Sequence, residues 1–447
     1  MLGKTRAEGK ILEVSANQAV KIGLLGCGTV GSGVVLILRD NGEHIARRLG
    51  KPIAIKKVLE LDPEKPRRLG LDPAVVTSDF NQILDDPEIE IVVEVMGGIE
   101  PARTYIIEAL HRGKSVVTAN KDLMALHGRE LFEAASEKNR DLYFEASVGG
   151  GIPIISPLKQ SLAANNIRAI FGIVNGTTNY ILTKMTLEGR SYLEVLQEAQ
   201  DLGYAESDPT SDVGGFDAAR KIAILASIAF GTRVTFPDVY VEGISGISPL
   251  DIAYGKELGY VLKLLAIAKE EDNLIEARVH PAFIPVHHPL ASVNDVFNAV
   301  FIKGDYVGDI MLYGRGAGQR PTASAIVGDI MEVARNSENG VTGRISCTCL
   351  ESKKIRPMGD VKSKFYLRLL AKDRPGVLAG IAGVFGSQQV SIASVIQKRT
   401  QGAMAEIVLV THKVEEANMQ DAMKILSGMA IVGGICNVIR VEGEDDL

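Results

Sequence analysis

The chain has 447 residues, a formal net charge of −6, and a composition that is 46% hydrophobic and 23% charged. This length favours about three domains, since one hydrophobic core rarely serves more than about 300 residues. The acidic balance, without a block of like charge, argues against a nucleic acid held through its phosphates. Residues 1–19 lack the apolar core of a signal peptide, and no apolar run has membrane-spanning length, so we expect a cytoplasmic protein without membrane contact.

The N-terminal third alternates predicted strands with predicted helices. A short apolar strand over residues 19–25 runs into the turn GCGTVG, which opens an apolar helix over residues 30–38. Strand, G-x-G-x-x-G and helix in this order favour dinucleotide binding, because the glycines allow a tight turn, close approach to the pyrophosphate, and helix packing on the strand. The candidate cofactor-binding residues are Gly26, Cys27, Gly28, Thr29, Val30 and Gly31.

The same alternation continues toward residue 144. Predicted strands cover residues 53–59, 91–95, 114–118 and 142–144, and predicted helices cover residues 101–112 and 123–138. Strands that alternate with helices at this spacing predict an α/β fold with a doubly wound parallel sheet.

The residues after the second predicted strand leave the coenzyme open between NAD and NADP. An acid at this position commonly binds the ribose hydroxyls of NAD, and a base binds the 2′-phosphate of NADP. Glu60 and Asp62 supply the acid, while Lys65, Arg67 and Arg68 supply the base. The sequence therefore allows either NAD or NADP.

Three polar clusters follow strands, where ligands meet this fold. Lys121 comes just after a predicted strand and would project over the nicotinamide edge, or is an ordinary exposed lysine. The glycine-rich segment that follows Glu145, up to residue 153, offers backbone carbonyls to a hard cation, or is a plain linker. The turn NGTTN at residues 175–179 lines a cleft or caps the helix after it.

An acid and a base stand at the start of one buried helix. Asp217 and Lys221 are four residues apart and so share a helix face, and the run from Lys221 to residue 230 is almost entirely apolar. A pair of this kind is most often a simple salt bridge. The alternative is a functional pair, since charged groups at the end of a buried helix are costly unless they are used.

Six ordered strings together resemble the homoserine dehydrogenase family over residues 20 to 345. They are GCGTVGSG, TANK, FEASVGGGIPI, NGTTNYIL, LGYAESDPTSDVGGFDAARK and GRGAGQRPTASA. The resemblance implies an oxidoreductase in which NAD or NADP carries hydride between L-homoserine and L-aspartate 4-semialdehyde, in threonine and methionine biosynthesis. Members of the family often carry an arginine for the 2′-phosphate where this chain has Leu61.

The resemblance also implies catalytic and substrate-binding residues. Lys221 would exchange the proton at the substrate oxygen. Asp217 and Glu206 would bind the substrate through their carboxylates. Lys121 would lie near both coenzyme and substrate, as a further catalytic and binding residue.

Two further sets of residues follow from the resemblance alone. Gly203 and Gly318 would lie against the coenzyme and a hinge. A monovalent cation, sodium or potassium, would bind the Glu145 side chain and backbone carbonyls. The residues that would supply these carbonyls are Val148, Gly150 and Ile152.

The expected domains are three. A Rossmann-type domain covers residues 19–150 and is completed by residues 314–345. An α+β domain over residues 151–313 binds substrate and, by the resemblance, also dimerises; its expected strands cover residues 167–174, 274–284 and 297–303. The third domain covers residues 363–444.

The C-terminal region has a pattern of its own. A strand at residues 364–372, the turn DRPGVL into a helix, and strands at 390–397, 403–411 and 435–441 give an order that resembles a ferredoxin-like ACT domain. The resemblance implies feedback regulation by L-threonine at Gly376, Val377 and Leu378, and assembly as a homodimer or homotetramer. The alternative is that this domain only dimerises.

Two other functions remain open on the sequence. One is a coenzyme-bound amino-acid sensor without turnover, and the other is a related amino-acid dehydrogenase. The four cysteines are too few and too scattered for a disulfide framework, and we expect Cys347 and Cys349 to alternate along a strand.

Overall fold

The computed structural model describes residues 19–344 and 346–443. The contacts that residues make with one another group the chain into two compact units. Of the described residues, the first unit contains 19–120, Arg129–Ala146, 318–344 and Ser346. The second unit contains Lys121–Gly128, Ser147–Ala317 and 347–443. The domain boundaries expected from the sequence stay a prediction.

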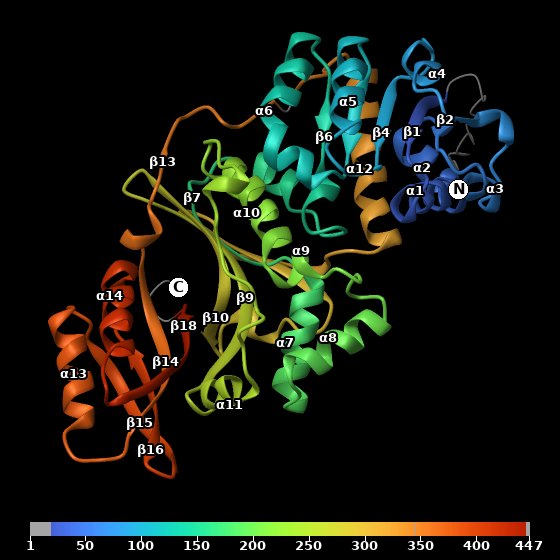
Figure 1. Ribbon diagram of the computed structural model, residues 1–447. Coiled ribbons are helices and arrows are strands. Elements are labelled where there is room, and N and C mark those ends of the chain that lie inside the picture. Colours follow the sequence, from blue (N-terminus) through green and yellow to red (C-terminus); the bar gives the residue numbers. More distant parts are fainter. Residues whose placement is uncertain (1–18, 345, 444–447) are drawn as a thin grey trace, which may run out of the picture. The chain divides into compact units, whose positions relative to one another are not determined.

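A parallel six-stranded sheet forms the centre of the first unit (Figure 1). Its order is β3-β2-β1-β4-β5-β6, and every neighbouring pair is parallel. The chain runs outward from β1 in both directions, so the predicted doubly wound α/β fold is confirmed. The strands are β1 (Val20–Leu25), β2 (Ile53–Leu59), β3 (Val76–Thr77), β4 (Ile91–Glu94), β5 (Ser115–Thr118) and β6 (Leu142–Tyr143).

Helix α12 lies against helix α1 within the first unit, although the two are far apart in the chain. A Cβ at Gly33 of α1 would lie 2.5 Å from the Gln319 carbonyl oxygen, so the two helices meet at backbone contact. Val34 and Ile326 are fully buried in their shared core. The helices are α1 (Thr29–Asp40), α2 (Gly42–Leu49), α3 (Glu64–Arg68), α4 (Asn81–Leu84), α5 (Ala102–His111) and α12 (Gln319–Glu338), with α6 (Lys121–Glu137) divided between the units.

A second, largely antiparallel sheet runs through the second unit in the order β12-β11-β7-β9-β10-β18-β14-β16-β15. Its first part contains three strands that the sequence did not predict, β8, β9 and β12. The strands of this part are β7 (Ile167–Ile173), β8 (Tyr240–Val241), β9 (Tyr260–Glu271), β10 (Leu274–Pro285), β11 (Phe297–Gly304) and β12 (Gly308–Arg315). The helices are α7 (Gly176–Glu188), α8 (Tyr192–Asp201), α9 (Thr210–Val213), α10 (Phe216–Ala229) and α11 (Pro249–Glu257).

The rest of the second unit is a C-terminal module, defined as β14 to β18 and drawn in orange to red in Figure 1. Its order β14-α13-β15-β16-α14-β18 is the predicted order of an ACT domain. Apolar side chains from β14 and α13, such as Phe365 and Phe385, are buried between helices and sheet. The elements are β14 (Lys362–Lys372), α13 (Val377–Ser387), β15 (Ile392–Gln401), β16 (Met404–Thr411), β17 (Val414–Glu415), α14 (Glu416–Ser427) and β18 (Val432–Val441).

The C-terminal module is hydrogen-bonded to the sheet of the same unit. Strand β18 pairs in parallel with β10 at Ala282 with Arg440 and at Phe283 with Val441. A short strand, β13 (Lys354–Ile355), pairs with the other end of β10 on the way into the module. The module is therefore joined to β10 through backbone hydrogen bonds as well as through the connecting chain.

The expectation that Cys347 and Cys349 alternate along a strand is wrong. The described chain from residue 346 to 350 has no regular structure, and the Cys349 N–H donates to Cys347 Sγ at 3.5 Å instead of to a neighbouring strand. Cys349 Sγ in turn lies 3.9 Å from the Ser227 carbonyl oxygen. Alternation of residue types without a partner strand does not produce a strand.

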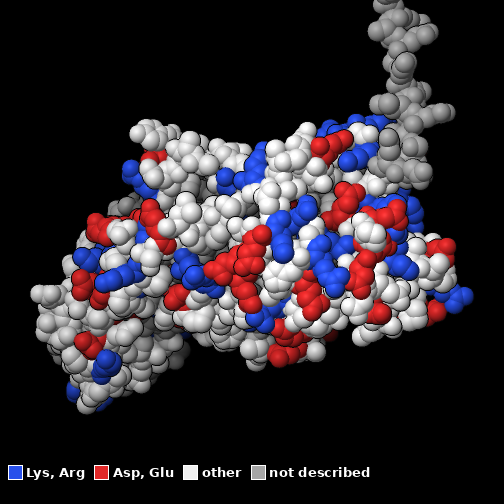
Figure 2. Space-filling view, turned by 90° about the horizontal axis from the view of Figure 1, so that it is seen from above, with Lys and Arg blue, Asp and Glu red and all other residues white. Residues whose placement is uncertain are grey.

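Acidic and basic side chains are mixed on the face shown in Figure 2, without a continuous patch of one sign. Opposite charges at such short spacing cancel beyond about a Debye length. Across the helices of the described residues, none combines the length and the apolar character needed to cross a membrane.

Candidate active site

The glycine-rich turn between β1 and α1 has the backbone geometry of a dinucleotide site. Gly26 adopts a φ of +97°, and a Cβ at Gly31 would lie 2.2 Å from the Gly26 carbonyl oxygen, so both positions require glycine. A Cβ at Gly28 would meet nothing within 4 Å, which leaves open space beside the backbone. α1 begins at Thr29, where helix N–H groups favour an anion such as a pyrophosphate.

Glu60 is fixed against this turn at the end of β2. Its carboxylate accepts hydrogen bonds from the Cys27 N–H at 2.9 Å and the Asp62 N–H at 3.1 Å, and pairs with Lys65 Nζ at 3.3 Å. Burial would raise the pKa of the Glu60 carboxyl, but these contacts outweigh burial and lower it. Leu61 beside it is 86% exposed, so an acid is held at the turn and an apolar side chain faces solvent.

In the second unit, Asp217 and Lys221 form the predicted pair on one face of α10. The distance from Lys221 Nζ to Asp217 Oδ2 is 2.7 Å, and Lys221 Nζ also donates to the Val174 carbonyl oxygen at 2.8 Å. Burial alone would raise the pKa of the Asp217 carboxyl, but the ammonium groups of Lys221 and Lys121 outweigh it and hold this pKa at about 2. Asp217 is therefore ionised at physiological pH although only 6% of it is exposed.

Lys121 is the third member of this cluster. It is the first residue of α6, which begins two positions earlier than the sequence predicted, and its Nζ lies 3.3 Å from Asp217 Oδ1. Burial would lower the pKa of Lys121, but the carboxylates of Asp217 and Asp122 raise it above the ordinary lysine value. The Asp217 carboxylate thus lies between two ammonium groups, one on each oxygen.

Asn175 connects this cluster to the start of α7. Its side-chain oxygen accepts the Thr178 N–H at 2.9 Å and so caps α7, as one of the two expectations for this turn had it. Its Nδ2 donates to Asp217 Oδ2 at 2.9 Å and to Asp212 Oδ1 at 2.8 Å. Burial, with the nearby Asp217 charge, raises the pKa of Asp212. The sequence showed this turn to be polar but did not predict its contacts with Asp212 and Asp217.

The loop after α8 carries two predicted residues, Gly203 and Glu206. Gly203 has a φ of +74°, which favours glycine, and the next carbonyl, that of Tyr204, accepts from Thr177 Oγ1 of α7 at 2.6 Å. Glu206 lies at the end of this loop and is exposed, and its backbone carbonyl accepts from Gln200 Nε2 at 3.0 Å. The loop is therefore anchored to the first turn of α7, next to the residue that binds Asp217.

The glycine-rich segment after β6 contains buried backbone oxygens without a hydrogen-bond partner. Val148, Gly150 and Ile152 are all buried, and within the described chain no hydrogen bond reaches their carbonyl oxygens. A Cβ at Gly150 would lie 2.5 Å from the Gly316 carbonyl oxygen, so this position also requires glycine. Buried carbonyls normally have a partner, and carbonyl oxygens are ligands of hard cations. Glu145, the predicted side-chain ligand, belongs to the first unit.

The remaining predicted residues lie at two other helix starts. Gly318 has a φ of +119° and precedes α12 in the first unit. Gly376 has a φ of +84° and precedes α13, with Leu378 45% exposed beside it. Among the described residues, no cluster of three or more His, Cys, Asp or Glu side chains could hold a metal ion.

Comparison with known proteins identifies the family. Family models match residues 26–145 ("Homoserine dehydrogenase, NAD binding domain"), 153–331 ("Homoserine dehydrogenase") and 365–429 ("ACT domain"). A homoserine dehydrogenase of Bacillus subtilis is 46% identical over 428 residues, which are 95% of this chain and 99% of that protein.

Solved structures agree with the sequence comparison. The structure of a homoserine dehydrogenase from Thiobacillus denitrificans has a TM-score of 0.91 and 44% identity, and covers 95% of this chain and 98% of its own. A hyperthermophilic archaeal homoserine dehydrogenase in complex with NADPH has a TM-score of 0.61 and 28% identity, and covers 70% of this chain and 97% of its own. The chain belongs to the homoserine dehydrogenase family, with a C-terminal ACT domain.

Proposed function

We propose that Lys221 exchanges the proton at the substrate oxygen during interconversion of L-homoserine and L-aspartate 4-semialdehyde. The hydrogen bonds that its ammonium group makes support this role. A lysine ammonium has three N–H donors, and two of those of Lys221 have partners, the Val174 carbonyl and Asp217. These two contacts fix the nitrogen and leave one donor direction for a substrate oxygen.

The proton and the hydride leave the alcohol separately in this reaction. When bound, the nicotinamide coenzyme would accept the hydride, and the hydroxyl proton would pass to the Lys221 nitrogen in its neutral amine form. In the reverse direction the Lys221 ammonium protonates the oxygen that receives charge as the aldehyde is reduced. Asp217 and Lys121 then serve as groups that hold this nitrogen and stabilise its changing charge.

Recognition of the amino acid requires a carboxylate for its ammonium group. Glu206 is exposed and takes part in no ion pair of the described chain, whereas Asp217 already pairs with two lysines. We therefore assign Glu206 the larger share of ammonium binding. Asp217 contributes mainly by ordering Lys121 and Lys221.

The coenzyme site carries groups suited to either nicotinamide dinucleotide. The archaeal relative named above was solved with NADPH, and this chain offers Lys65 and Arg67 near the end of β2 for a 2′-phosphate. Glu60, fixed at the turn, suits the ribose hydroxyls of NAD. Gly203 and Gly318 are proposed to lie against the bound coenzyme.

A monovalent cation, sodium or potassium, is proposed to bind the buried carbonyl oxygens of Val148, Gly150 and Ile152. For regulation, the turn at Gly376, Val377 and Leu378 is proposed to bind L-threonine, the end product of the pathway, in a homodimer or homotetramer. Gly376 supports this proposal because it is exposed directly before α13, where a small amino acid can reach the backbone of the turn.

The first experiment is initial-rate oxidation of L-homoserine with NAD and with NADP, each with and without L-threonine and with sodium or potassium. Lys221→Ala should abolish turnover. Lys184→Ala is the matched control, because Lys184 also pairs with an acid four residues away, Glu188, on the nearby helix α7. Turnover retained in Lys221→Ala would refute its role. Absence of turnover in the folded wild-type protein would favour an amino-acid sensor.

A further inference from the structure

The turn that precedes α10 packs against the segment after β8. The Ile244 N–H donates to the Val213 carbonyl oxygen at 2.9 Å, and a Cβ at Gly243 would lie 2.4 Å from that same oxygen. Gly215, with a φ of +83°, directly precedes α10, and a Cβ there would lie 3.2 Å from Val241 Cγ1 and 3.4 Å from the Glu242 carbonyl oxygen. Backbone touches backbone here, so a shift of either segment moves the other.

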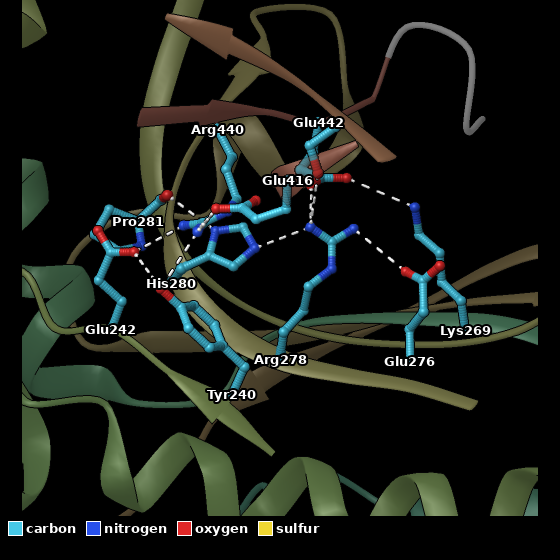
Figure 3. A network of polar contacts seen from close by, with 11 residues as sticks. Tyr240, Glu242, Lys269, Glu276, Arg278, His280, Pro281, Glu416, Arg440 and Glu442 are labelled. Carbon is cyan, nitrogen blue, oxygen red and sulfur yellow. Dashed lines mark hydrogen bonds and ion pairs between the residues drawn. The ribbon is translucent and has the colours of Figure 1, made fainter. Parts of the chain in front are cut away.

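Glu242 connects this segment to the C-terminal module. Its N–H donates to the Val279 carbonyl oxygen of β10 at 2.8 Å, which fixes its backbone. Its carboxylate accepts from Arg440 Nη1 of β18 at 2.7 Å (Figure 3). The Tyr240 ring lies under the same guanidinium, with Arg440 Cζ 5.1 Å from the ring centroid. The backbone of Glu242 therefore lies beside the turn that precedes α10, and its side chain binds the module.

Arg440 is itself held rigidly on the side of the module. Its Nε and Nη2 donate to the two carboxylate oxygens of Glu416, at 3.0 and 2.6 Å, in a bidentate pair. Both side chains are almost completely buried, at 6% and 5% exposure, whereas the Glu242 side chain is 41% exposed. Glu242 also borders a hollow that is lined in part by Met419 and Met423 of α14. Solvent therefore reaches the Arg440–Glu242 contact but hardly reaches the Arg440–Glu416 pair.

A short path leads from the same turn to the catalytic groups. Asp212 lies in α9, directly before the turn, and accepts from Asn175, which also donates to Asp217. Asp217 holds Lys221 and Lys121. All of these residues belong to the second unit. Asp217 is thus fixed from two sides that both depend on the turn: its own helix and Asn175.

We infer that Glu242 is a positioning residue for the dehydrogenase reaction, through which Arg440 of the C-terminal module holds the turn that orients Asp217 and Lys221. This inference rests on the proposed roles of Asp217 and Lys221. The inference gives a function to the ion pair between the module and the segment after β8. Backbone hydrogen bonds alone would be enough to attach the module. The conformation of the module thereby affects the catalytic groups through the turn before α10.

The test compares two ion pairs, each of which joins the C-terminal module to the rest of the second unit. Glu242→Ala removes the pair with Arg440, and Glu242→Gln keeps an oxygen that can still accept from it. Glu257→Gln is the matched control. Glu257 of α11 pairs with Lys398 of the module, and its side chain is 57% exposed. Helix α11 is separate from the turn that precedes α10. The measurements are kcat and KM for L-homoserine, KM for the coenzyme, and the melting temperature.

Glu242→Ala should lower kcat/KM for L-homoserine by about threefold to tenfold, with an unchanged coenzyme KM, since couplings of this kind are modest. Glu242→Gln should lie between Glu242→Ala and wild type, and Glu257→Gln should match wild type in kinetics. Equal kinetics for Glu242→Ala and Glu257→Gln would overturn the inference, as would a loss confined to melting temperature. If Lys221→Ala were active, the proposed catalytic role would fail first, which is a separate result.

Discussion

Replacement of Asp217 by asparagine should move the pH dependence of catalysis to lower pH. The carboxylate has one ammonium group on each oxygen, at 2.7 Å from Lys221 and 3.3 Å from Lys121. Asparagine has nearly the same shape and can still accept from Lys221, so Asp217→Asn removes charge with little change in packing. Two lysine nitrogens would then lose the negative charge that lies between them.

The magnitude follows from the carboxyl group itself. Its pKa is about 2 in place of an ordinary 3.8, which corresponds to roughly 2 kcal/mol of net stabilisation of the ionised form despite burial. Attraction between charges is reciprocal, so the carboxylate favours the protonated form of the lysines by at least a comparable total. Divided between two lysines, its loss should move the pH dependence of catalysis down by about one pH unit.

The assay is kcat/KM for L-homoserine and for L-aspartate 4-semialdehyde between pH 6 and 10. Oxidation requires a neutral base and reduction requires an ammonium acid, so the limb that reports the lysine should move down by about one pH unit in both directions of reaction. Glu188→Gln is the control, since Glu188 pairs with Lys184 in the same i, i+4 geometry on α7. A limb that stays in place or moves up in Asp217→Asn would refute the reasoning.

Three further predictions concern the coenzyme, a buried lysine and a helix contact. Glu60→Ala should raise the ratio of kcat/KM with NADP to that with NAD by about tenfold, because it removes a negative charge from the end of β2 where a 2′-phosphate would lie; an unchanged ratio in initial-rate assays would exclude Glu60 from coenzyme selection. Burial lowers the pKa of Lys263, which is 1% exposed, from 10.5 to about 8. Between pH 8 and 10.5 Lys263 is therefore protonated in the unfolded chain and mostly neutral in the folded protein, so the free energy of unfolding rises with pH. Relative to Lys263→Met, wild type should therefore gain about 2 to 3 kcal/mol in the free energy of unfolding from pH 7 to pH 10, and a flat difference in denaturant titrations would contradict this. Gly33→Ala should destabilise the first unit by about 1 to 3 kcal/mol through its contact with the Gln319 carbonyl, seen as a lower melting temperature, whereas Gly42→Ala, where a Cβ meets nothing within 4 Å, should not.

The sequence predicted best those parts of the molecule in which the chemistry is local. The turn from Gly26 to Gly31 requires glycine for reasons of backbone geometry that lie within six residues, and the expected strand, turn and helix all appear. The shared face of Asp217 and Lys221 follows from helix geometry alone and is likewise confirmed. The order of strands and helices in the C-terminal module was also correct, because each element has a clear apolar pattern between turn residues.

Contacts between distant segments were missed, and so were elements that depend on them. Strand β12 is an edge strand whose side chains are mostly exposed or half-buried, so its sequence lacks the apolar run that marks a central strand. Strand β3 has only two residues and exists because β2 lies beside it. Cys347 and Cys349 show the opposite error, since their alternating pattern was not matched by a partner strand.

The arrangement around Asp217 depends on both kinds of information. Its position on α10 is local, but its low pKa requires Lys121 from the start of α6 and Asn175 from the start of α7, neither of which is near it in the chain. A carboxylate this buried would favour its neutral form without them. Charge at Asp217 is therefore a property of the folded second unit, and any segment that places α6, α7 or the turn before α10 affects it. Glu242 lies beside that turn and binds Arg440, so the inference drawn above predicts that the electrostatics at Asp217 respond to the C-terminal module, although no residue of the module contacts Asp217 in the described structure.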